Sequence, residues 1–517
     1  MATRTFDPVT LQILWNRLIG IVDEGAITLV RTSFSSVVQE CNDYACVIMD
    51  ARGRGLADNP RSIPAFIGTL PRTTRALLEE LPPETWAPGD VVVTNDPWLG
   101  TGHLPDFSLV APVFHRDRLV AFAGSVAHAA DVGGINWGSH AREVFEEGIR
   151  IPVSKLFEAG RPNRQLLRIL EANVRVPEQV IGDLFAQVAA VEVCQERVGE
   201  FLADAGLEDL EVLAEAIQQH GEQSMRAAIR AVPDGVYEHA VPIDGFEETL
   251  TVRCRVTVDG DRLDVDYAGT SPQVPHGVNS PMSYTYAYTK YPLKCALDPL
   301  TPKNEGSYLP LSVRAPAGSI LNATFPAPVS ARHLSGMYCA AAVFGALARA
   351  IPDRVMADSS GPPARPIFAG TDRDGKPFSL IVFPWGGMGA RPTADGLACT
   401  AYPGNDACAS VEVMETLAPV RFHEKQLVRD SGGVGKFEGG AGQRLAIELV
   451  ADRPATLSIM SARFRTPANG LLGGGPGSLT EVRINGQPVA ANARHVVQPG
   501  DVVTLGYPGG GGYGDPR

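Results

Sequence analysis

The sequence lacks the features that define several large classes of protein. Among its 517 residues, no apolar run reaches the ~18–20 that a membrane-spanning helix needs, and the most apolar stretch, 339–351, is too short. There is no run of five or more Lys or Arg, and the formal net charge is −13, which argues against a basic nucleic-acid surface. The first seven residues carry no apolar segment of a secretory signal. We therefore expect no membrane and no nucleic acid among its partners.

Cysteine is scarce and shows no metal-binding or redox pattern. The eight cysteines are scattered singly, and none forms a C-x-x-C pair. In a chain of this size, that pattern is typical of reduced, mostly buried thiols in the cytoplasm. Cys41 and Cys46 have no histidine adjacent in sequence, so we interpret both as packing residues rather than nucleophiles.

Nucleotide-binding and serine-nucleophile motifs are absent as well. The chain contains no G-x-x-x-x-G-K-[ST], no G-x-S-x-G and no H-E-x-x-H. Residues 509–514 match G-x-G-x-x-G by letter, but no helix can follow them to receive a pyrophosphate. Nineteen of the 54 glycines fall in the last 90 residues. We interpret these glycine clusters as turns and close-packed β corners, not as a phosphate site.

The patterns that are present predict a mixed α+β protein in two parts. Residues 1–231 read as an α/β domain, with helices expected over 7–33, 178–203 and 207–231. Residues 232–517 read as a β-dominated domain punctuated by Gly and Pro. One helix is expected there, near residues 335–350. Strands are expected in the first part over 45–49, 91–94, 109–114 and 119–126.

Three polar segments in the first part concentrate side chains that bind metals. Residues 40–43 precede a strand, 95–106 form a loop after a strand, and 128–131 end another strand. A rigid sheet presents functional groups at such strand ends. His103 and Asp106 would offer a mixed N/O donor set, suited to Zn²⁺, Mn²⁺ or Fe²⁺ rather than Ca²⁺. By spacing alone the pair could equally be a hydrogen-bonded histidine and a capping carboxylate.

Six motifs occur in a fixed order along the chain. They are Asn95-Asp-Pro97 through Gly102-His103-Leu-Pro-Asp106, His128-Ala-Ala-Asp131-Val-Gly-Gly134, Glu147-Gly-Ile-Arg-Ile-Pro152, Gly277-Val-Asn-Ser280, Asp430-Ser-Gly-Gly433 and Pro508 to Asp515. With them the chain resembles the hydantoinase B/oxoprolinase family over nearly its full length. That family includes B subunits of ATP-dependent hydantoinases and lactamases, the C-terminal part of 5-oxoprolinase, and large subunits of acetone and acetophenone carboxylases.

The resemblance implies four metal ligands, Asp43, His103, Asp106 and His128. The metal stays open between Zn, Mn and Fe, because members of the family do not all report the same one. Residues 44–45 and 126–127 differ from the commonest family wording, so substrate contacts could differ there.

Other polar residues near these ligands have two interpretations each. Asp131 could act as a catalytic base or orient an imidazole, or it could cap the Gly-Gly turn that follows it. We take Asp131 and the ligand His128 as the candidate catalytic residues. Glu40 and Asp96 could support the ligands, but could equally be turn or cap residues. Three further histidines could reach a substrate pocket or be ordinary core or surface residues: His140, His276 and His333.

The activity implied by the resemblance is the hydrolytic ring opening of a cyclic amide. Resonance makes an amide carbonyl a poor electrophile. In the family, a hydantoinase A-type partner holds ATP and Mg²⁺ and phosphorylates the carbonyl oxygen. Our hypothesis for this chain is the second half-reaction, in which a metal held by the four implied ligands lowers the pKa of a bound water molecule, which then attacks the activated carbon. The lack of any nucleotide motif here is consistent with that division of labour.

The partner is expected as a separate chain, since 517 residues match only the B part. The assembly would be a hetero-oligomer with two or more copies of each subunit. The substrate stays open between a hydantoin, a lactam and an oxoproline-like ring. Two alternatives remain: the large subunit of an ATP-dependent ketone carboxylase, and a non-catalytic subunit that stabilises its partner.

Overall fold

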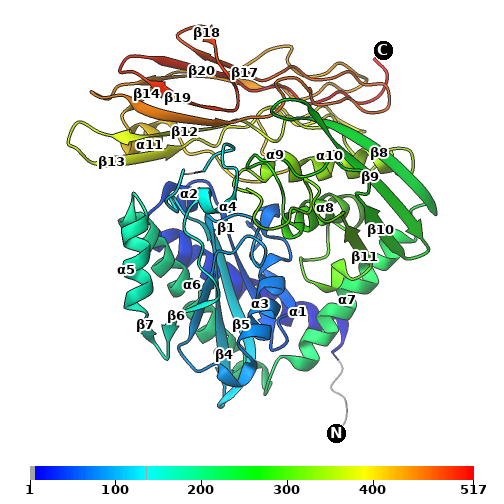
Figure 1. Ribbon diagram of the computed structural model, residues 1–517. Coiled ribbons are helices and arrows are strands. Elements are labelled where there is room, and N and C mark those ends of the chain that lie inside the picture. The colour runs from blue at the N-terminus through cyan, green and yellow to red at the C-terminus, as the bar shows by residue number, and fades with distance from the viewer. Residues whose placement is uncertain (1–5, 136, 517) are drawn as a thin grey trace.

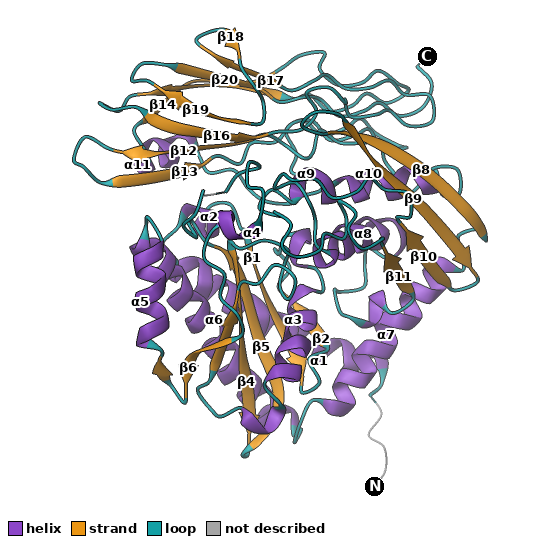
Figure 2. Cartoon of the chain, viewed as in Figure 1, coloured by secondary structure: helices purple, strands orange, loops and turns teal. Residues whose placement is uncertain are grey.

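The computed structural model describes residues 6–135 and 137–516. Figure 1 shows a lower body built on one large sheet, a smaller sheet backed by helices beside it, and further sheets stacked above. Helices and strands are mixed through the chain, which confirms the α+β class (Figure 2). None of the described helices is both long enough and apolar enough to cross a membrane.

The lower body contains a seven-stranded sheet with the order β2-β1-β5-β4-β3-β6-β7. Every pairing within it is antiparallel. Its strands are β1 (Tyr44–Asp50), β2 (Gly55–Asp58), β3 (Val91–Thr94), β4 (Asp106–His115), β5 (Arg118–His128), β6 (Ser154–Glu158) and β7 (Arg161–Pro162). The four strands expected from sequence lie within β1, β3, β4 and β5.

Both faces of this sheet are covered, and successive residues of β1 show it. Ala45, Val47 and Met49 pack into one hydrophobic cluster, whereas Cys46 and Ile48 pack into another. This is the two-residue alternation of a strand. The second cluster includes residues of the long helices α1 (Pro8–Thr32) and α6 (Pro177–Ala205), and the first includes residues of α3 (Thr69–Glu80). The strands nearest the site are therefore held rigidly from both sides.

The helices of the first part follow their local signals. Helix α1 begins after Asp7, whose carboxylate accepts the N–H groups of Val9 and Thr10. Pro71 lies in the first turn of α3, where its missing N–H costs no helical hydrogen bond. The helices here are α1 (Pro8–Thr32), α2 (Ser36–Gln39), α3 (Thr69–Glu80), α4 (Val144–Glu147), α5 (Arg164–Asn173), α6 (Pro177–Ala205) and α7 (Glu211–Ile229).

Beside the lower body, a four-stranded sheet of order β11-β10-β9-β8 packs against helices. Its strands are β8 (Gly235–Asp244), β9 (Thr249–Asp259), β10 (Arg262–Asp266) and β11 (Leu311–Arg314), and its helices are α8 (Met282–Leu297), α9 (His333–Gly336) and α10 (Tyr338–Leu347). Helices α9 and α10 fall where one helix was expected. Helix α8 was not expected, because its Tyr- and Thr-rich sequence with Pro292 favours strands; burial of most of its residues stabilises it instead.

Two more sheets lie above, with the orders β13-β12-β16-β19 and β14-β15-β20-β17-β18. Their elements are β12 (Arg365–Thr371), β13 (Pro377–Ile381), α11 (Val411–Leu417), β14 (Val420–Leu427), β15 (Gln443–Leu449), β16 (Ala455–Met460), β17 (Glu481–Ile484), β18 (Gln487–Pro488), β19 (Ala493–Val497) and β20 (Val502–Gly506). The boundary expected at 231/232 falls between α7 and β8. One hydrophobic cluster nevertheless joins Val47, Val252 and Met460, so the parts share a core.

The glycine clusters form a bundle of extended segments outside the regular strands. We call the segments 386–390, 432–442, 470–477 and 509–514 the glycine bundle. Their backbones bond to one another directly: Gly510 donates to the carbonyl of Gly440 at 3.0 Å, and Gly512 donates to that of Gly475 at 2.9 Å. A Cβ on Gly387 would overlap the carbonyl oxygen of Gly440. Glycine is therefore required by close approach of backbones.

Candidate metal centre

Strand register brings the predicted ligands to one edge of the large sheet. Asp106 is the first residue of β4 and His128 the last of β5, and the two are direct partners across the antiparallel pair. Asp43 immediately precedes β1, and its carbonyl accepts the N–H of His128 at 3.1 Å. His103 lies in the loop that leads into β4. Residues far apart in sequence thus meet at the ends of three adjacent strands.

Three of these side chains converge on one point. The Nε2 atom of His103 lies 2.8 Å from Oδ1 of Asp106, and Nδ1 of His128 lies 3.1 Å from the same oxygen. The candidate ligand atoms of the three residues all lie within 4.8 Å of one another, and all three side chains are buried. Asp43 is at the margin, with its Oδ2 3.8 Å from Nδ1 of His128. The structure therefore groups three of the expected ligands tightly and places the fourth beside them.

The orientation of His103 fits a bound cation. Its Nδ1 lies 2.9 Å from the carbonyl oxygen of Ser330, which can only accept, so Nδ1 carries the proton and Nε2 a lone pair. Nε2 is buried and has no hydrogen-bond partner among the described residues, although Asp106 is close. A lone pair facing a carboxylate is unfavourable unless a cation lies between them. Buried imidazole and carboxylate donors suit a divalent transition metal.

The carboxylate of Asp106 is held by two further groups. Its Oδ2 accepts Nη2 of Arg332 at 2.7 Å and the hydroxyl of Thr101. The Nε of Arg332 also donates to the carbonyl of Thr101 at 3.0 Å. Gly102 has a φ of 108°, and a Cβ there would lie 2.8 Å from Cδ of Arg332. Glycine at this position lets the guanidinium reach across the loop.

The carbonyl that orients His103 is itself fixed. The indole N–H of Trp137 donates to the same Ser330 oxygen at 2.8 Å. Oε1 of Glu147 accepts the backbone N–H groups of Val329 and Ser330, each at 2.7 Å. Glu147 therefore clamps the loop on which the tautomer of His103 depends. Sequence reasoning noted Glu147 only within a motif and gave it no role.

Burial dominates the electrostatics of these groups. Desolvation raises the pKa of Asp43 to about 7, although His128 acts in the opposite direction. Desolvation lowers the pKa of His103 to about 4, with Arg332 adding to the effect. Burial alone would raise the pKa of Asp106, but His103 and Arg332 hold it well below its usual value. Burial also raises the pKa of Glu147 to about 8. Asp106 is thus the permanent anion of the cluster.

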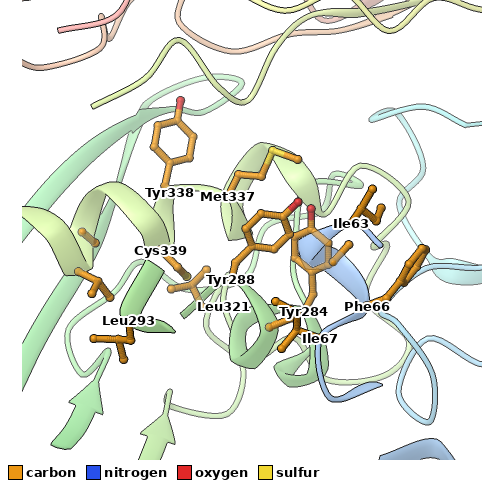
Figure 3. Close-up of a cluster of buried hydrophobic side chains, with 14 of the residues drawn as sticks. Ile63, Phe66, Ile67, Tyr284, Tyr288, Leu293, Leu321, Met337, Tyr338 and Cys339 are labelled. Atoms are coloured by element: carbon orange, nitrogen blue, oxygen red, sulfur yellow. The ribbon is translucent and has the colours of Figure 1, made fainter. Parts of the chain in front are cut away.

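A cavity of about 40 Å³ opens on this cluster. It has room for roughly one to three water molecules. Figure 3 shows two of its side chains, Tyr284 and Tyr288, side by side on α8 with Met337 above them. Trp137 contributes from the first part, and most of the remaining lining comes from residues beyond 231: Arg332, His333, Arg365, Phe383, Gly404 and Asp406. Among the charged ones, Arg332, Arg365 and Asp406 were missed by sequence reasoning.

Asp131 does not reach the cavity. Its Oδ1 accepts the N–H of Gly133 at 3.1 Å and Nη1 of Arg175 at 2.6 Å, and its Oδ2 accepts the N–H of Arg175. It is not among the described residues that line the cavity. The chain turns away directly afterwards through Gly133 and Gly134, which have positive φ angles. This placement favours the turn-capping interpretation of Asp131 over that of a base.

The other polar residues considered from the sequence can also be sorted by whether they line the cavity. Asp96 caps a turn by accepting the N–H of Trp98, and Glu40 is exposed. His276 stacks on Phe246 with ring centroids 3.8 Å apart, and His140 contacts the same ring edge-on. Neither histidine lines the cavity within the described residues. Of the three histidines left open by the sequence, the structure places His333 alone on the cavity wall.

Comparison with known proteins gives one consistent result. The sequence model described as "Hydantoinase B/oxoprolinase" matches residues 7–516. A protein of Pseudomonas sp. strain NS671, named provisionally as the B component of a D-/L-hydantoinase, is 30% identical; the match covers 99% of this chain and 91% of that protein.

Two solved structures are also similar. That of the ATP-dependent caprolactamase from Pseudomonas jessenii has a TM-score of 0.91 at 28% identity, covering 99% of this chain and 92% of that one. A nucleotide-free acetone carboxylase structure has a TM-score of 0.92 at 20% identity, covering 99% and 76%. At that identity the carboxylase likeness shows the fold alone.

Proposed function

The chain belongs to the hydantoinase B/oxoprolinase family, and from that premise we propose that it is the B subunit of an ATP-dependent cyclic amide hydrolase. The observation that carries the proposal is the buried convergence of His103, Asp106 and His128, with the lone pair of His103 Nε2 directed at the shared carboxylate. Such a site is suited to activating water. The substrate would be a hydantoin, a lactam or an oxoproline-like ring.

The residues of the site would have separate tasks. Asp43, His103, Asp106 and His128 would hold Zn²⁺, Mn²⁺ or Fe²⁺, which when bound supplies Lewis-acid activation of water. Arg332 fixes the Asp106 carboxylate, and Glu147 fixes the Ser330 loop that sets the His103 tautomer. The side chains that line the cavity are buried, which strengthens electrostatic interactions with a reacting group there.

The partner would supply the activation step. The name of the Pseudomonas relative, as one component of a hydantoinase, supports a two-component system. We propose a hydantoinase A-type ATPase that holds ATP and Mg²⁺ and phosphorylates the substrate's carbonyl oxygen, in a cytoplasmic hetero-oligomer with two or more copies of each subunit. After attack of water on the activated carbon, the carbon–nitrogen bond would break as the ring nitrogen gains a proton, and the acyl phosphate left behind would be hydrolysed to a carboxylate and inorganic phosphate.

The experiment is a paired assay of the complex formed by co-expressing the chain with a hydantoinase A-type ATPase subunit. One arm supplies ATP with hydantoin, 5-oxoproline or ε-caprolactam; the other supplies ATP, bicarbonate and acetone or acetophenone. Ring-opened or carboxylated products are measured by mass spectrometry, and bound metal by elemental analysis. We expect ring opening, lost together with bound metal in His103→Ala.

His140→Ala serves as the matched control, because His140 lies outside the cavity, and it should retain both activity and metal. Carboxylation without ring opening would instead identify a ketone carboxylase. Ring opening that survives His103→Ala and Asp106→Asn would indicate a non-catalytic subunit.

A further inference from the structure

The segment 330–335 contributes Arg332 and His333 to the cavity wall, and its backbone is firmly held. The Ala331 N–H donates to the carbonyl of Gly277 at 2.6 Å, and the carbonyl of Arg332 accepts the Ser280 hydroxyl at 2.9 Å. A Cβ at Gly336 would overlap the ring of Tyr284. The side chains on this segment are therefore presented in fixed positions.

Within that segment, one polar side chain stands apart. Ser330 accepts the N–H of Gly138, Arg332 binds Asp106, and Ser335 donates to the carbonyl of Val278. Both ring nitrogens of His333, by contrast, are buried and find no hydrogen-bond partner among the described residues. Burying two unpaired polar atoms is costly, and native structures rarely do so without reason.

The surroundings of His333 keep it neutral. Burial, followed by Arg365 and Arg332, holds its pKa well below the usual value. A neutral imidazole offers one N–H donor and one acceptor nitrogen. Because the two nitrogens point away from each other, one of them can meet a given amide: the N–H can donate to a carbonyl oxygen, or the bare nitrogen can accept the ring N–H of a hydantoin or a lactam.

Flat rings and a second buried ion pair complete the same wall. The ring of Trp137 lies 5.5 Å from that of His333 and 6.1 Å from that of Phe383. Nη2 of Arg365 donates to Oδ2 of Asp406 at 2.7 Å, with both side chains buried. Aromatic faces beside fixed polar groups are what a small planar ring needs for orientation.

We propose that His333 is a substrate-contacting residue that hydrogen-bonds the amide group of the cyclic amide in the cavity that the metal ligands also line. The assignment rests on the proposed function. It specifies a place for the ring: amide edge toward His333, flat face against Trp137 and Phe383. Because a cyclic amide is larger than the present cavity, the lining must yield as it enters, and Met337 is the most adaptable of the side chains there.

The test compares His333→Leu, which removes both nitrogens at similar size, with His333→Asn, which keeps a donor and an acceptor. His276→Leu is the control, because His276 also has an unpaired buried nitrogen but lies outside the cavity. Each variant is assayed in complex with the ATPase subunit. KM and kcat are measured for whichever of hydantoin, 5-oxoproline and ε-caprolactam the wild type opens. Bound metal and Tm are measured in parallel.

For His333→Leu we expect kcat/KM to fall about 10- to 100-fold, with metal content unchanged and Tm equal or higher, because no internal hydrogen bond is lost. His333→Asn should recover part of the activity, and His276→Leu should match the wild type. Wild-type kinetics in His333→Leu would overturn the assignment, and so would loss of metal or a lowered Tm, since either would make His333 structural.

Direct binding separates this assignment from the proposed function. Saturation-transfer NMR with hydantoin as the probe is run on the same complexes. Binding by the wild type that disappears in His333→Leu supports the contact even if no ring is opened. If ring opening occurs and His333→Leu has unchanged hydantoin binding and unchanged kinetics, the proposed His333 contact is wrong, whereas the proposed hydrolase function stands. If the wild type neither binds hydantoin nor opens any of the rings, both the His333 contact and the hydrolase function are wrong.

Discussion

The metal cavity and the glycine bundle are packed by opposite means. Around the cavity, large polar side chains such as Arg332, Trp137 and Glu147 fill the space, and each fixes its neighbour through hydrogen bonds. In the glycine bundle, carbonyl and N–H groups of neighbouring segments bond directly to one another. Substitutions should therefore act on chemistry in the first region and on folding in the second.

The largest effect is expected from Asp106→Asn, on the cavity side of this comparison. Asp106 lies close to both candidate histidine ligands, and it also forms an ion pair with Arg332. Its negative charge therefore holds both the ligand side chains and the guanidinium in place. We expect turnover of the cyclic amide to fall about 1,000-fold or more, equivalent to about 4 kcal/mol of transition-state stabilisation. Bound metal should fall in parallel. Full activity with full metal content would remove Asp106 from the ligand set.

In the glycine bundle, Gly387→Ala should lower stability and leave the activity of the folded protein unchanged. The added Cβ would overlap a backbone oxygen, which cannot move as a flexible side chain can. We expect the free energy of unfolding to drop by about 3 kcal/mol, with unchanged kcat per folded molecule. Denaturant unfolding and metal-normalised activity measure the two quantities.

Gly20→Ala is the matched control for that substitution. Gly20 lies within α1, and a Cβ there meets no atom within 4 Å. It should stabilise the protein by about 0.5–1 kcal/mol, since alanine loses less conformational entropy in a helix. If the two alanine variants unfolded alike, backbone contact would not be what the glycine bundle requires.

The two regions also differ in how far sequence alone could predict them. Strands β1, β4 and β5 and helix α1 have clear local signals, so the sheet edge could be anticipated. The ligand set came from the family resemblance, because spacing alone left the roles of His103 and Asp106 open. Arg365 and Asp406 come from distant segments that meet only in the fold, and no spacing links them to His103. Helix α8 was missed because burial, not propensity, determines it. The closeness of Asp131 to His128 in sequence suggested a catalytic role, but the chain turns away from the cavity at the glycines that follow Asp131.

A smaller effect is expected at Glu147, which holds the loop around Ser330. Burial raises its pKa from 4.5 to about 8, so the folded protein retains a proton that the unfolded chain has released above about pH 4.5. That contribution to stability is complete below pH 4.5 and is lost as pH rises toward 8. Glu147→Gln should flatten this part of the stability–pH curve in denaturant unfolding at pH 5–8.

The same residue tests the clamp on His103. Glu147→Gln keeps an oxygen for the Val329 and Ser330 N–H groups, so its activity should stay close to wild type. Glu147→Ala leaves both N–H groups unpaired, and we expect turnover to fall about 10-fold with weaker metal retention. If wild type and Glu147→Gln had the same stability–pH curve, Glu147 would not hold a buried proton. If wild type, Glu147→Gln and Glu147→Ala were equally active, Glu147 would not act as a clamp on the Ser330 loop.

The smallest catalytic effect is expected from Asp131→Asn, and it tests the limit of the cavity's chemistry. Asp131 binds Arg175 and the Gly133 turn rather than facing the cavity, so kcat and its pH profile should be unchanged. Only the turn and a half-exposed ion pair are weakened, which should cost about 1 kcal/mol of unfolding free energy. If kcat fell 100-fold with the metal retained, Asp131 would act as the base after all. Asp131 is not among the described residues that line the cavity. An unchanged kcat in Asp131→Asn would therefore indicate that the side chains lining the cavity carry out the chemistry.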